Sequence, residues 1–246
     1  MKKEKKKLKK RFLRRKVVFL LVLASTFIFP LFSSTYFALG RVEVRGEREL
    51  SSFELLSLSK IRPRRNLFCL NLRKIRANLQ RHPKIKEVEI SRRLPNTVLL
   101  KVRERKPEAV VFTHNLFWII DKEGFVLDKK DNKGRLHLPL LTGVGKLKMR
   151  IGERLKDEKV SQALDCLRFS SCLQPEKLAK VGFDSWGKVY LYTKSGLEIR
   201  LGEAEDLREK IEEIPLVLER VKESSPRVKY IDIQVKDRPA AGSGEI

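Results

Sequence analysis

The 246-residue sequence predicts an α+β protein with a single N-terminal transmembrane helix, a small β-α-α-β-β domain and a larger C-terminal mixed β domain with helices. Three observations predict this architecture. A charge-free apolar stretch follows a very basic N-terminus, as in membrane anchors. Strand and helix patterns then alternate over residues 40–106. Short alternating segments with Gly and Asn turns and two amphipathic helices occupy residues 107–238.

Residues 1–16 are expected to form a basic cytoplasmic tail. The chain carries 55 Lys/Arg against 31 Asp/Glu, a net charge of +24. Eleven of these cations and one acid, Glu4, lie in the first 16 residues, so the tail alone carries +10. An orientation signal that also touches anionic lipid head groups explains this charge. Nucleic acid is therefore not expected as a partner.

Residues 17–39 are expected to be the transmembrane helix. They contain no charged side chain. At ~1.5 Å per residue they reach about 35 Å, enough to cross a ~30 Å hydrocarbon core. A cleaved signal peptide ending near Ala38-Leu39-Gly40 is the alternative, but its apolar core would span only ~7–15 residues; a buried core helix is a third reading. The basic tail would leave residues 40–246 outside the cytoplasm.

The domain predicted over residues 40–106 contains two helices and three strands. Its expected elements are strand 41–45, a helix N-capped by Ser51 or Ser52 and stopped by Pro63, a helix from Asn71 to before Pro83, and strands 84–92 and 97–104 joined by Leu94-Pro95-Asn96. Ser51 and Glu54 have the spacing of a capping box. In the last strand Val98, Leu100 and Val102 share one face, which predicts a small core beneath two helices.

The domain predicted over residues 107–238 is mostly strand. Strands are expected at 109–113, 116–120, 125–127, 178–183, 188–193, 197–201 and 228–236, and helices at 157–173 and 207–222. Pro215 is expected to kink or split the second helix. Residues 136–145 read as a turn-rich connector, and residues 239–246 as a flexible C-terminal tail.

The sequence contains no constellation typical of an enzyme, so no catalytic, cofactor-binding or metal-binding residue is predicted. Gly-rich phosphate loops, Gly-x-Ser-x-Gly, His-Glu-x-x-His and Ser-x-x-Lys are missing. The acids at Asp121 and Glu123 are read as a solvated turn. Cys69, Cys166 and Cys172 are read as small buried hydrophobes, with a Cys166–Cys172 bridge as an alternative. A binding or scaffold protein is the class that remains.

Six segments carry a resemblance to a known family. In chain order they read VEVRGERELSSFEL, NLFCLNLRKIRANLQRHPKIKEVEISRRLPNTVLLKVRERKPEAVV, WIIDKEGFVL, LPLLTG, LEIRLGEAEDLREKIEEI and YIDIQVKDRP. Their order after one basic-flanked anchor resembles the bacterial cell-division family FtsQ/DivIB. The first two look like its POTRA domain, with Arg93-Leu94-Pro95 and Val102-Arg103-Glu104-Arg105 as signature. The others look like the β domain of that family.

The resemblance implies a function that composition does not reveal. Members are non-catalytic divisome proteins that lie at midcell in the plasma (inner) membrane. They cross it once, with a cytoplasmic N-terminus and an extracytoplasmic C-terminal domain. They bind FtsB and FtsL in a ternary complex, contact other divisome proteins and link early division proteins to septal peptidoglycan synthesis. Membrane lipids would contact residues 1–39. The rival reading is a POTRA-containing envelope biogenesis or transport factor, which would require tandem POTRA repeats or a C-terminal barrel.

The resemblance also implies a binding mode, in which a partner strand pairs with the edge strand near the C-terminus. On this chain the implied partner-binding residues are Tyr230, Ile231, Asp232, Ile233, Gln234, Val235 and Lys236. Gln234 stands where many relatives have Arg. The plain alternative is a closing strand without a partner. We expect Ile233→Pro to abolish FtsB binding, because proline removes a backbone donor.

Overall fold

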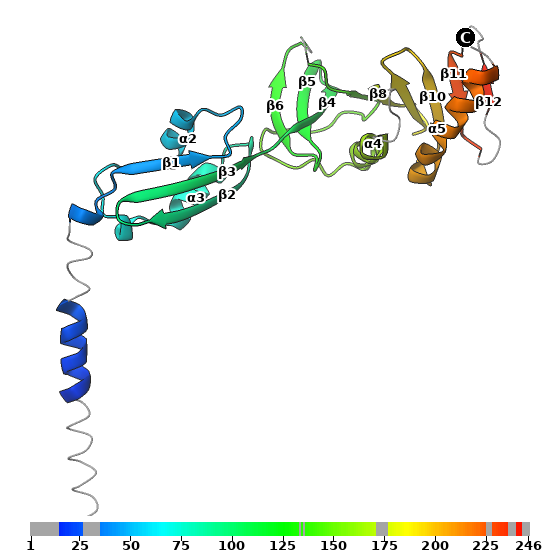
Figure 1. Ribbon diagram of the computed structural model, residues 1–246. Helices are drawn as coiled ribbons and strands as arrows, with labels where there is room; N and C mark the ends of the chain where they lie inside the picture. The colour runs from blue at the N-terminus through cyan, green and yellow to red at the C-terminus, as the bar shows by residue number, and fades with distance from the viewer. Residues whose placement is uncertain are drawn as a thin grey trace, which may run out of the picture. The chain divides into compact units, whose positions relative to one another are not determined.

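The structure is a computed structural model that describes residues 15–26, 35–132, 134, 136–170, 177–224, 228–235 and 240–242. Its contacts divide the chain into two compact units, Met1–Glu104 (unit 1) and Arg105–Ile246 (unit 2) (Figure 1). Each unit has a hydrophobic core of its own. The fold is α+β, as predicted.

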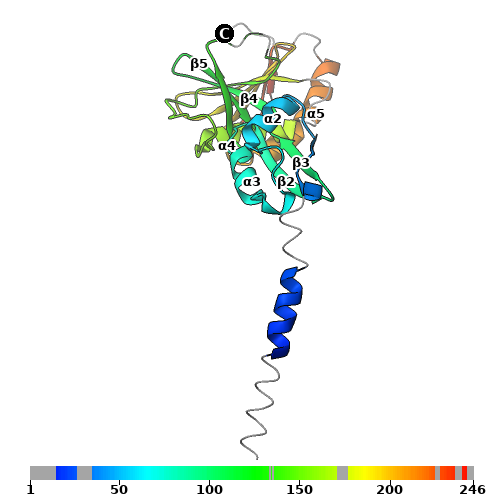
Figure 2. The ribbon, with the colours of Figure 1, turned by 90° about the vertical axis from the view of Figure 1, so that its left-hand side faces the viewer.

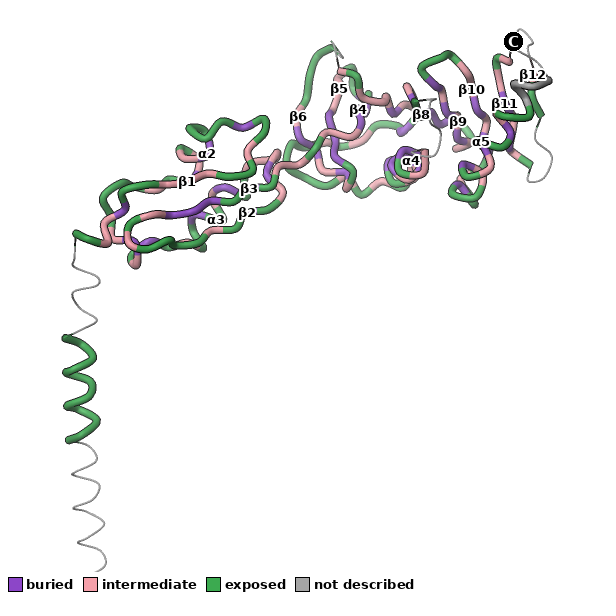
Figure 3. The backbone as a smooth tube through the Cα atoms, viewed as in Figure 1, coloured by how far each residue is buried: buried purple, intermediate pink, exposed green. Residues whose placement is uncertain are grey.

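The N-terminal helix covers residues 15–26, and its apolar side chains are exposed (Figure 3). The rest of the predicted tail and most of the remaining anchor, residues 1–14 and 27–34, lie outside the described residues. None of the described helices is both long and apolar enough to span a bilayer. The last two residues of the predicted anchor belong to the folded domain of unit 1, since Ala38 bridges Asn66 and Leu39 is buried in the core.

Unit 1 has the predicted order of strands and helices. Its elements are η1 (Thr35–Phe37), β1 (Arg41–Arg45), α2 (Ser52–Ser59), η2 (Leu67–Cys69), α3 (Leu72–Gln80), β2 (Ile85–Arg93) and β3 (Thr97–Glu104). The sheet order is β1-β3-β2, with β1 parallel and β2 antiparallel to β3. The last strand of the unit therefore lies between the other two.

The two helices of unit 1 begin where the sequence predicts. The Ser51 hydroxyl accepts a hydrogen bond from the Glu54 backbone N–H at 3.1 Å, and the Asn71 side chain accepts one from Lys74 N–H at 3.0 Å. Each cap satisfies a backbone donor that the first helical turn leaves without a partner. Both helices contact the sheet and each other (Figure 2).

The central strand β3 supplies the core of unit 1. Val98 and Leu100 are completely buried and Val102 nearly so, as the alternation predicts. Leu55 of α2 and Leu79 of α3 pack in the same cluster. At the end of β3, the Glu104 carboxylate accepts hydrogen bonds from the backbone N–H groups of residues 48, 49 and 50 at 2.9–3.3 Å. These hydrogen bonds to the Glu104 carboxylate fix the loop that follows β1.

Unit 2 is built on one nine-stranded mixed sheet. Its elements are β4 (Pro107–Thr113), β5 (Leu116–Asp121), β6 (Val126–Lys130), β7 (Leu140–Thr142), α4 (Glu158–Phe169), β8 (Leu178–Phe183), β9 (Val189–Thr193), β10 (Glu198–Gly202), α5 (Leu207–Ser224), β11 (Tyr230–Asp232) and β12 (Ala240–Gly242). The strand order is β12-β11-β10-β9-β8-β7-β4-β5-β6. β12 and β6 are therefore the two ends of the described sheet.

Strand β7 corrects the prediction of a connector over residues 136–145. Leu140–Thr142 lies in the middle of the sheet, parallel to both β4 and β8. Leu141 is completely buried and belongs to the core. Three residues are too few to show alternation, so the long-range pairing with β4 and β8 decides this element.

Helix α5 contradicts one of the two expectations for Pro215, that the proline splits the helix, while the expected kink stays a prediction. One helix runs from Leu207 to Ser224 with the proline inside. Ile211 and Ile214 before it are completely buried, and Val217 after it is nearly so. Packing of this apolar face on both sides of Pro215 outweighs the lost backbone donor.

The acids near residue 121 do not form a solvated turn. Asp121 is buried, and its Oδ1 accepts hydrogen bonds from the backbone N–H groups of Glu123 and Phe125, both at 2.9 Å. Its Oδ2 pairs with Arg105 at 2.6 Å, and the Arg105 guanidinium also lies 3.7 Å from the centre of the Phe125 ring. This buried ion pair ties the first residue of unit 2 to the β5–β6 turn.

The cysteines behave in two ways. Cys166 of α4 is buried and free, and burial raises the pKa of its thiol to about 12. Cys69 of η2 is exposed, which corrects its assignment to the core. The third, Cys172, lies outside the described residues, and the alternative of a bridge to Cys166 is wrong for this structure because the Cys166 thiol is free.

Candidate partner-binding strand

The strand predicted to bind a partner has neighbours on both sides. β11 pairs in parallel with β10, with Glu198 opposite Tyr230 and Arg200 opposite Asp232. On its other side it pairs with β12, with Gly242 opposite Tyr230. The strand is also shorter than the predicted 228–236: it ends at Asp232. β11 is therefore not the edge of the described sheet.

Residues 240–242 occupy the place expected for the partner. They were predicted to belong to a flexible tail, but they form β12, whose Ala240 and Ala241 are exposed. Sequence reasoning missed this strand because Ala-Ala-Gly has neither alternation nor strand propensity. Pairing with β11 creates it, and Gly242 fits beneath the Tyr230 side chain, where any Cβ would lie 2.5 Å from the phenolic oxygen.

Two of the seven predicted contact residues are core residues. Ile231 is completely buried and Ile233 is 1% exposed. Both pack in the large cluster that also contains Ile199 of β10 and Ile211 of α5. The Ile233 backbone N–H donates to the Arg200 carbonyl at 2.9 Å. These side chains hold the segment in place and offer nothing to a partner.

Tyr230 lies in a layer of charged and aromatic side chains. The Arg200 guanidinium lies 4.5 Å from the centre of its ring, and Arg200 Nε donates to Glu198 at 2.7 Å. That hydrogen bond raises the pKa of Arg200 above its ordinary value. The stack fixes Tyr230 between β10 and β12.

Asp232 and Gln234 form the turn that ends β11. Asp232 accepts hydrogen bonds from the Gln234 backbone N–H at 3.0 Å and from its side-chain amide at 3.1 Å. The Gln234 side-chain oxygen accepts from Lys188 Nζ at 3.3 Å. Val235 is 61% exposed, and Lys236 lies outside the described residues. Tyr230, Asp232 and Gln234 are thus held by neighbours, while Val235 is open to contact.

An acidic cavity of about 380 Å³ adjoins this turn. Gln234, Val235, Lys188 and Lys210 line it together with five carboxylates, Glu203, Glu205, Asp206, Glu209 and Glu213. Lys210 is engaged by the backbone carbonyls of Leu201 and Glu203, each at 3.0 Å. The excess of carboxylates gives the cavity a negative potential. Among the described residues, no group of His, Cys, Asp and Glu is placed to hold a metal ion.

Comparisons with known proteins assign the two units to one family. The family model "POTRA domain, FtsQ-type" matches residues 37–105, and "Cell division protein FtsQ/DivIB, C-terminal" matches residues 109–234. The second match alone covers more than half of the chain. The chain belongs to the FtsQ/DivIB family. The resemblance seen in the sequence is thereby confirmed.

Relatives in this family match along most of the chain. Cell division protein DivIB of Clostridium tetani is 25% identical over 226 residues, covering 90% of this chain and 85% of the relative. Cell division protein FtsQ of Syntrophotalea carbinolica is 26% identical over 212 residues, covering 85% and 74%. Membership of the FtsQ/DivIB family supports a role in cell division, at the division-site membrane and together with other division proteins.

Among the solved structures that match is one of a bacterial cell division protein. It is the major extracytoplasmic domain of the cell division protein DivIB from Geobacillus stearothermophilus. It has a TM-score of 0.31 and 12% sequence identity, and the match covers 50% of this chain and 98% of that chain. A likeness at this level adds nothing to the family assignment, which rests on the sequence matches.

Proposed function

We propose that this chain is a non-catalytic scaffold of the bacterial division machinery, required for septum formation. The part of the apolar stretch that precedes the folded residues of unit 1 holds it in the plasma membrane, residues 1–16 lie in the cytoplasm, and the two folded domains lie outside. The basic tail and the exposed apolar helix over residues 15–26 support this topology. Placed at midcell, the chain links early division proteins to septal peptidoglycan synthesis.

The proposed partners are FtsB and FtsL, bound by addition of a partner strand to the long sheet. The observation that carries this proposal is the position of β12 at the end of the strand order. β12 has no second strand neighbour among the described residues, and its alanines are exposed. A strand edge of this kind pairs through backbone groups. We therefore place the partner strand on β12, one strand beyond the predicted edge.

β11 and the turn that follows it provide the side chains proposed for this interface. Tyr230, Asp232, Gln234, Val235 and Lys236 remain the proposed contact residues, whereas Ile231 and Ile233 act through the core. The acidic cavity beside Gln234 and Val235 favours a partner with Lys or Arg next to its strand. Backbone pairing supplies affinity, and the cavity supplies selectivity.

The contacts of Ile233 make Ile233→Pro unsuitable as a test. The change would remove the hydrogen bond to the Arg200 carbonyl and a buried side chain. Loss of binding would then reflect damage to the sheet. A test must remove the edge strand and leave β11 intact.

Truncation of the C-terminus provides that test. A chain ending at residue 239 lacks β12, whereas a control ending at Gly242 keeps it. We expect the first truncation to weaken co-purification with FtsB and FtsL by about tenfold or more, because a strand's worth of backbone pairing is lost. The control should bind like the full chain, and both should keep the melting temperature of the full chain within a few degrees.

Two outcomes would contradict strand addition at β12. Full binding by the folded chain ending at residue 239 would place the partner elsewhere. Stronger binding by that chain would show that β12 competes with the partner for β11.

A further inference from the structure

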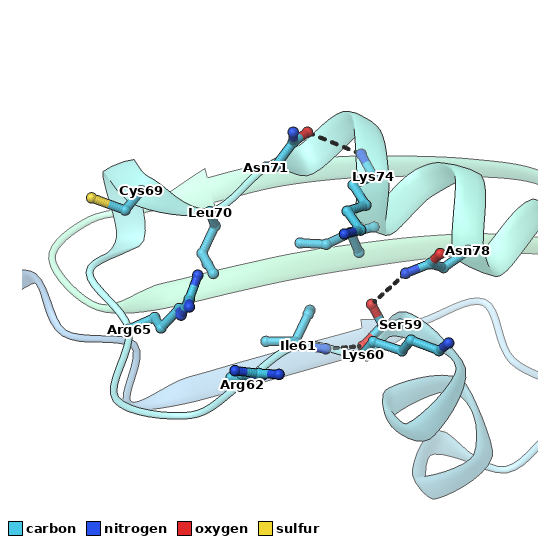
Figure 4. A pocket seen from close by; sticks show the side chains of 11 residues that line it. Ser59, Lys60, Ile61, Arg62, Arg65, Cys69, Leu70, Asn71, Lys74 and Asn78 are labelled. Atoms are coloured by element: carbon cyan, nitrogen blue, oxygen red, sulfur yellow. Dashed lines mark hydrogen bonds between the residues drawn. The ribbon is translucent and has the colours of Figure 1, made fainter.

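A surface cavity of about 340 Å³ lies in unit 1 between the end of α2 and the start of α3 (Figure 4). Leu70 and Ile75 are among its apolar lining residues and belong to the core of the unit. Asn78 Nδ2 donates to the Ser59 carbonyl at 3.4 Å, and the buried Ser59 hydroxyl accepts from Ile61 N–H at 3.2 Å. These bonds tie the walls together, so the cavity is a built feature of the two-helix layer.

The charged lining of this cavity is entirely positive. Lys60, Arg62, Arg65 and Lys74 line it, and no Asp or Glu does (Figure 4). None of the four forms an ion pair with a described residue. The surrounding sequence explains why, because residues 55–86 contain ten Lys/Arg and no acid. Cations gathered in a concavity without a counter-charge favour a compact anion.

The wall of the cavity is bonded to the chain that leaves the apolar stretch. Leu39 N–H donates to the Arg65 carbonyl at 2.8 Å, and Arg64 N–H donates to the Leu39 carbonyl at 3.3 Å. Ala38 bridges Asn66 next to them. The cationic loop is thus fixed to the residues where the chain would emerge from the membrane.

Aromatic side chains occupy the same end of unit 1. Tyr36 is 67% exposed and meets the Phe37 ring edge to face, with ring centres 5.1 Å apart. Phe37 meets Phe68 in the same manner at 5.3 Å, and Cys69, the next residue, lines the cavity. Aromatic rings and cations beside an apolar segment are typical of the membrane interface.

We propose that this cavity binds the phosphodiester head group of an anionic phospholipid in the membrane that holds the protein. The inference rests on the proposed membrane anchor. Arg62 and Arg65 present guanidinium groups that suit phosphate oxygens, and Lys60 and Lys74 add point charges from the α2 and α3 sides. A phospholipid fits better than an extended anionic polymer, because the cations enclose a small volume next to an exposed aromatic.

The test measures binding of a soluble anionic lipid to the full chain in a neutral detergent. Dihexanoyl phosphatidylglycerol is titrated calorimetrically, with dihexanoyl phosphatidylcholine as the zwitterionic reference. The cavity variant combines Arg62→Gln, Arg65→Gln and Lys74→Gln. The matched control combines Arg73→Gln, Arg76→Gln and Arg81→Gln, which are exposed, lie in the same segment and do not line the cavity.

We expect the cavity variant to weaken phosphatidylglycerol binding by at least about tenfold and the control by less than about twofold. Phosphatidylcholine should bind weakly to all three proteins. Equal loss in both variants would overturn the proposal in favour of a diffuse positive surface. Inorganic phosphate or a poly(glycerol phosphate) chain binding as tightly as the lipid would overturn the lipid assignment.

Two further measurements separate this inference from the proposed function. The cavity variant should keep its melting temperature and its co-purification with FtsB and FtsL, because β12 belongs to the other unit. Resistance of the full chain to alkaline extraction from membranes tests the anchor by itself. Loss of lipid binding in an anchored, FtsB-competent cavity variant supports the head-group site alone.

Discussion

In both units, single charged side chains hold loops and turns in place through hydrogen bonds and ion pairs. At the end of unit 1 the Glu104 carboxylate accepts hydrogen bonds from three backbone N–H groups. At the start of unit 2 the next residue, Arg105, pairs with the buried Asp121. The division between the units falls between these two residues. Each is thus anchored in its own unit, which gives the Val-Arg-Glu-Arg signature a physical meaning.

Removing Asp121 should destabilise unit 2. Its side chain is 3% exposed and that of Arg105 is 10% exposed, so Asp121→Ala would leave a nearly buried cation with only the more exposed Glu123 carboxylate as an ionic partner. We expect the free energy of unfolding to fall by about 3 kcal/mol. Both tryptophans, Trp118 and Trp186, lie in unit 2, so fluorescence during urea unfolding reports on this unit.

The matched control is Glu123→Ala. Glu123 also pairs with Arg105, at 3.1 Å, but its side chain is 37% exposed. We expect a loss of less than about 1 kcal/mol, because solvent screens this pair. Equal losses for the two variants would contradict the central role of Asp121.

The two described cysteines should differ in reactivity. The thiolate is the reacting species, and burial raises the pKa of Cys166 to about 12, so little thiolate exists at pH 8. We expect iodoacetamide at pH 8 to alkylate exposed Cys69 in the folded protein and leave Cys166 unmodified. Peptide mass spectrometry reads both sites. As a control, Cys166 should be alkylated once the protein is unfolded in urea. Rapid alkylation of Cys166 in the folded protein would contradict its burial.

At the scale of elements, packing overrides local propensity in α5. Proline in a helix interior removes a backbone donor and clashes with the preceding turn. Ile211, Ile214 and Val217 nevertheless bury one continuous face of this helix in the core. The same competition explains β7 and β12, which are too short to form by propensity and exist because neighbouring strands pair with them.

Replacing Pro215 should therefore stabilise the protein. Pro215→Ala restores an N–H that can donate to the Ile211 carbonyl four residues earlier, and alanine is the best helix former. We expect the free energy of unfolding to rise by about 1–3 kcal/mol in the fluorescence assay. Leu216→Ala, at a 52% exposed position beside it, is the control and should change little. Lower stability in Pro215→Ala would mean that the proline is needed for the packing of this helix.

At the scale of the whole molecule, the two units were predictable to different degrees. The starts of both helices and the bounds of the strands in unit 1 were predicted within a residue or so, because Ser51 and Asn71 cap the helices and Val98, Leu100 and Val102 share a buried face of β3. In unit 2 the strands β8, β9 and β10 were predicted within a residue or so. The order of strands in the long sheet was not, since it depends on pairings between distant segments.

The candidate site was predicted in part. The family resemblance directed attention to residues 230–236, and β11 is a strand there. The sequence did not reveal that Ala240–Gly242 covers it, nor that five carboxylates from residues 203–213 gather beside Gln234. Both features require the return of the chain after α5, which no local pattern encodes.

The sequence by itself determined the basic N-terminus, the apolar stretch, the order of elements in unit 1 and the family. These depend on composition, caps and periodicity, which are properties of neighbouring residues. Only the tertiary structure decided that β7 lies inside the sheet, that β12 forms its end and that four cations line a cavity whose wall is bonded to Leu39. Those features arise from contacts between residues far apart in sequence, where pairing and packing select among conformations that local propensity leaves open.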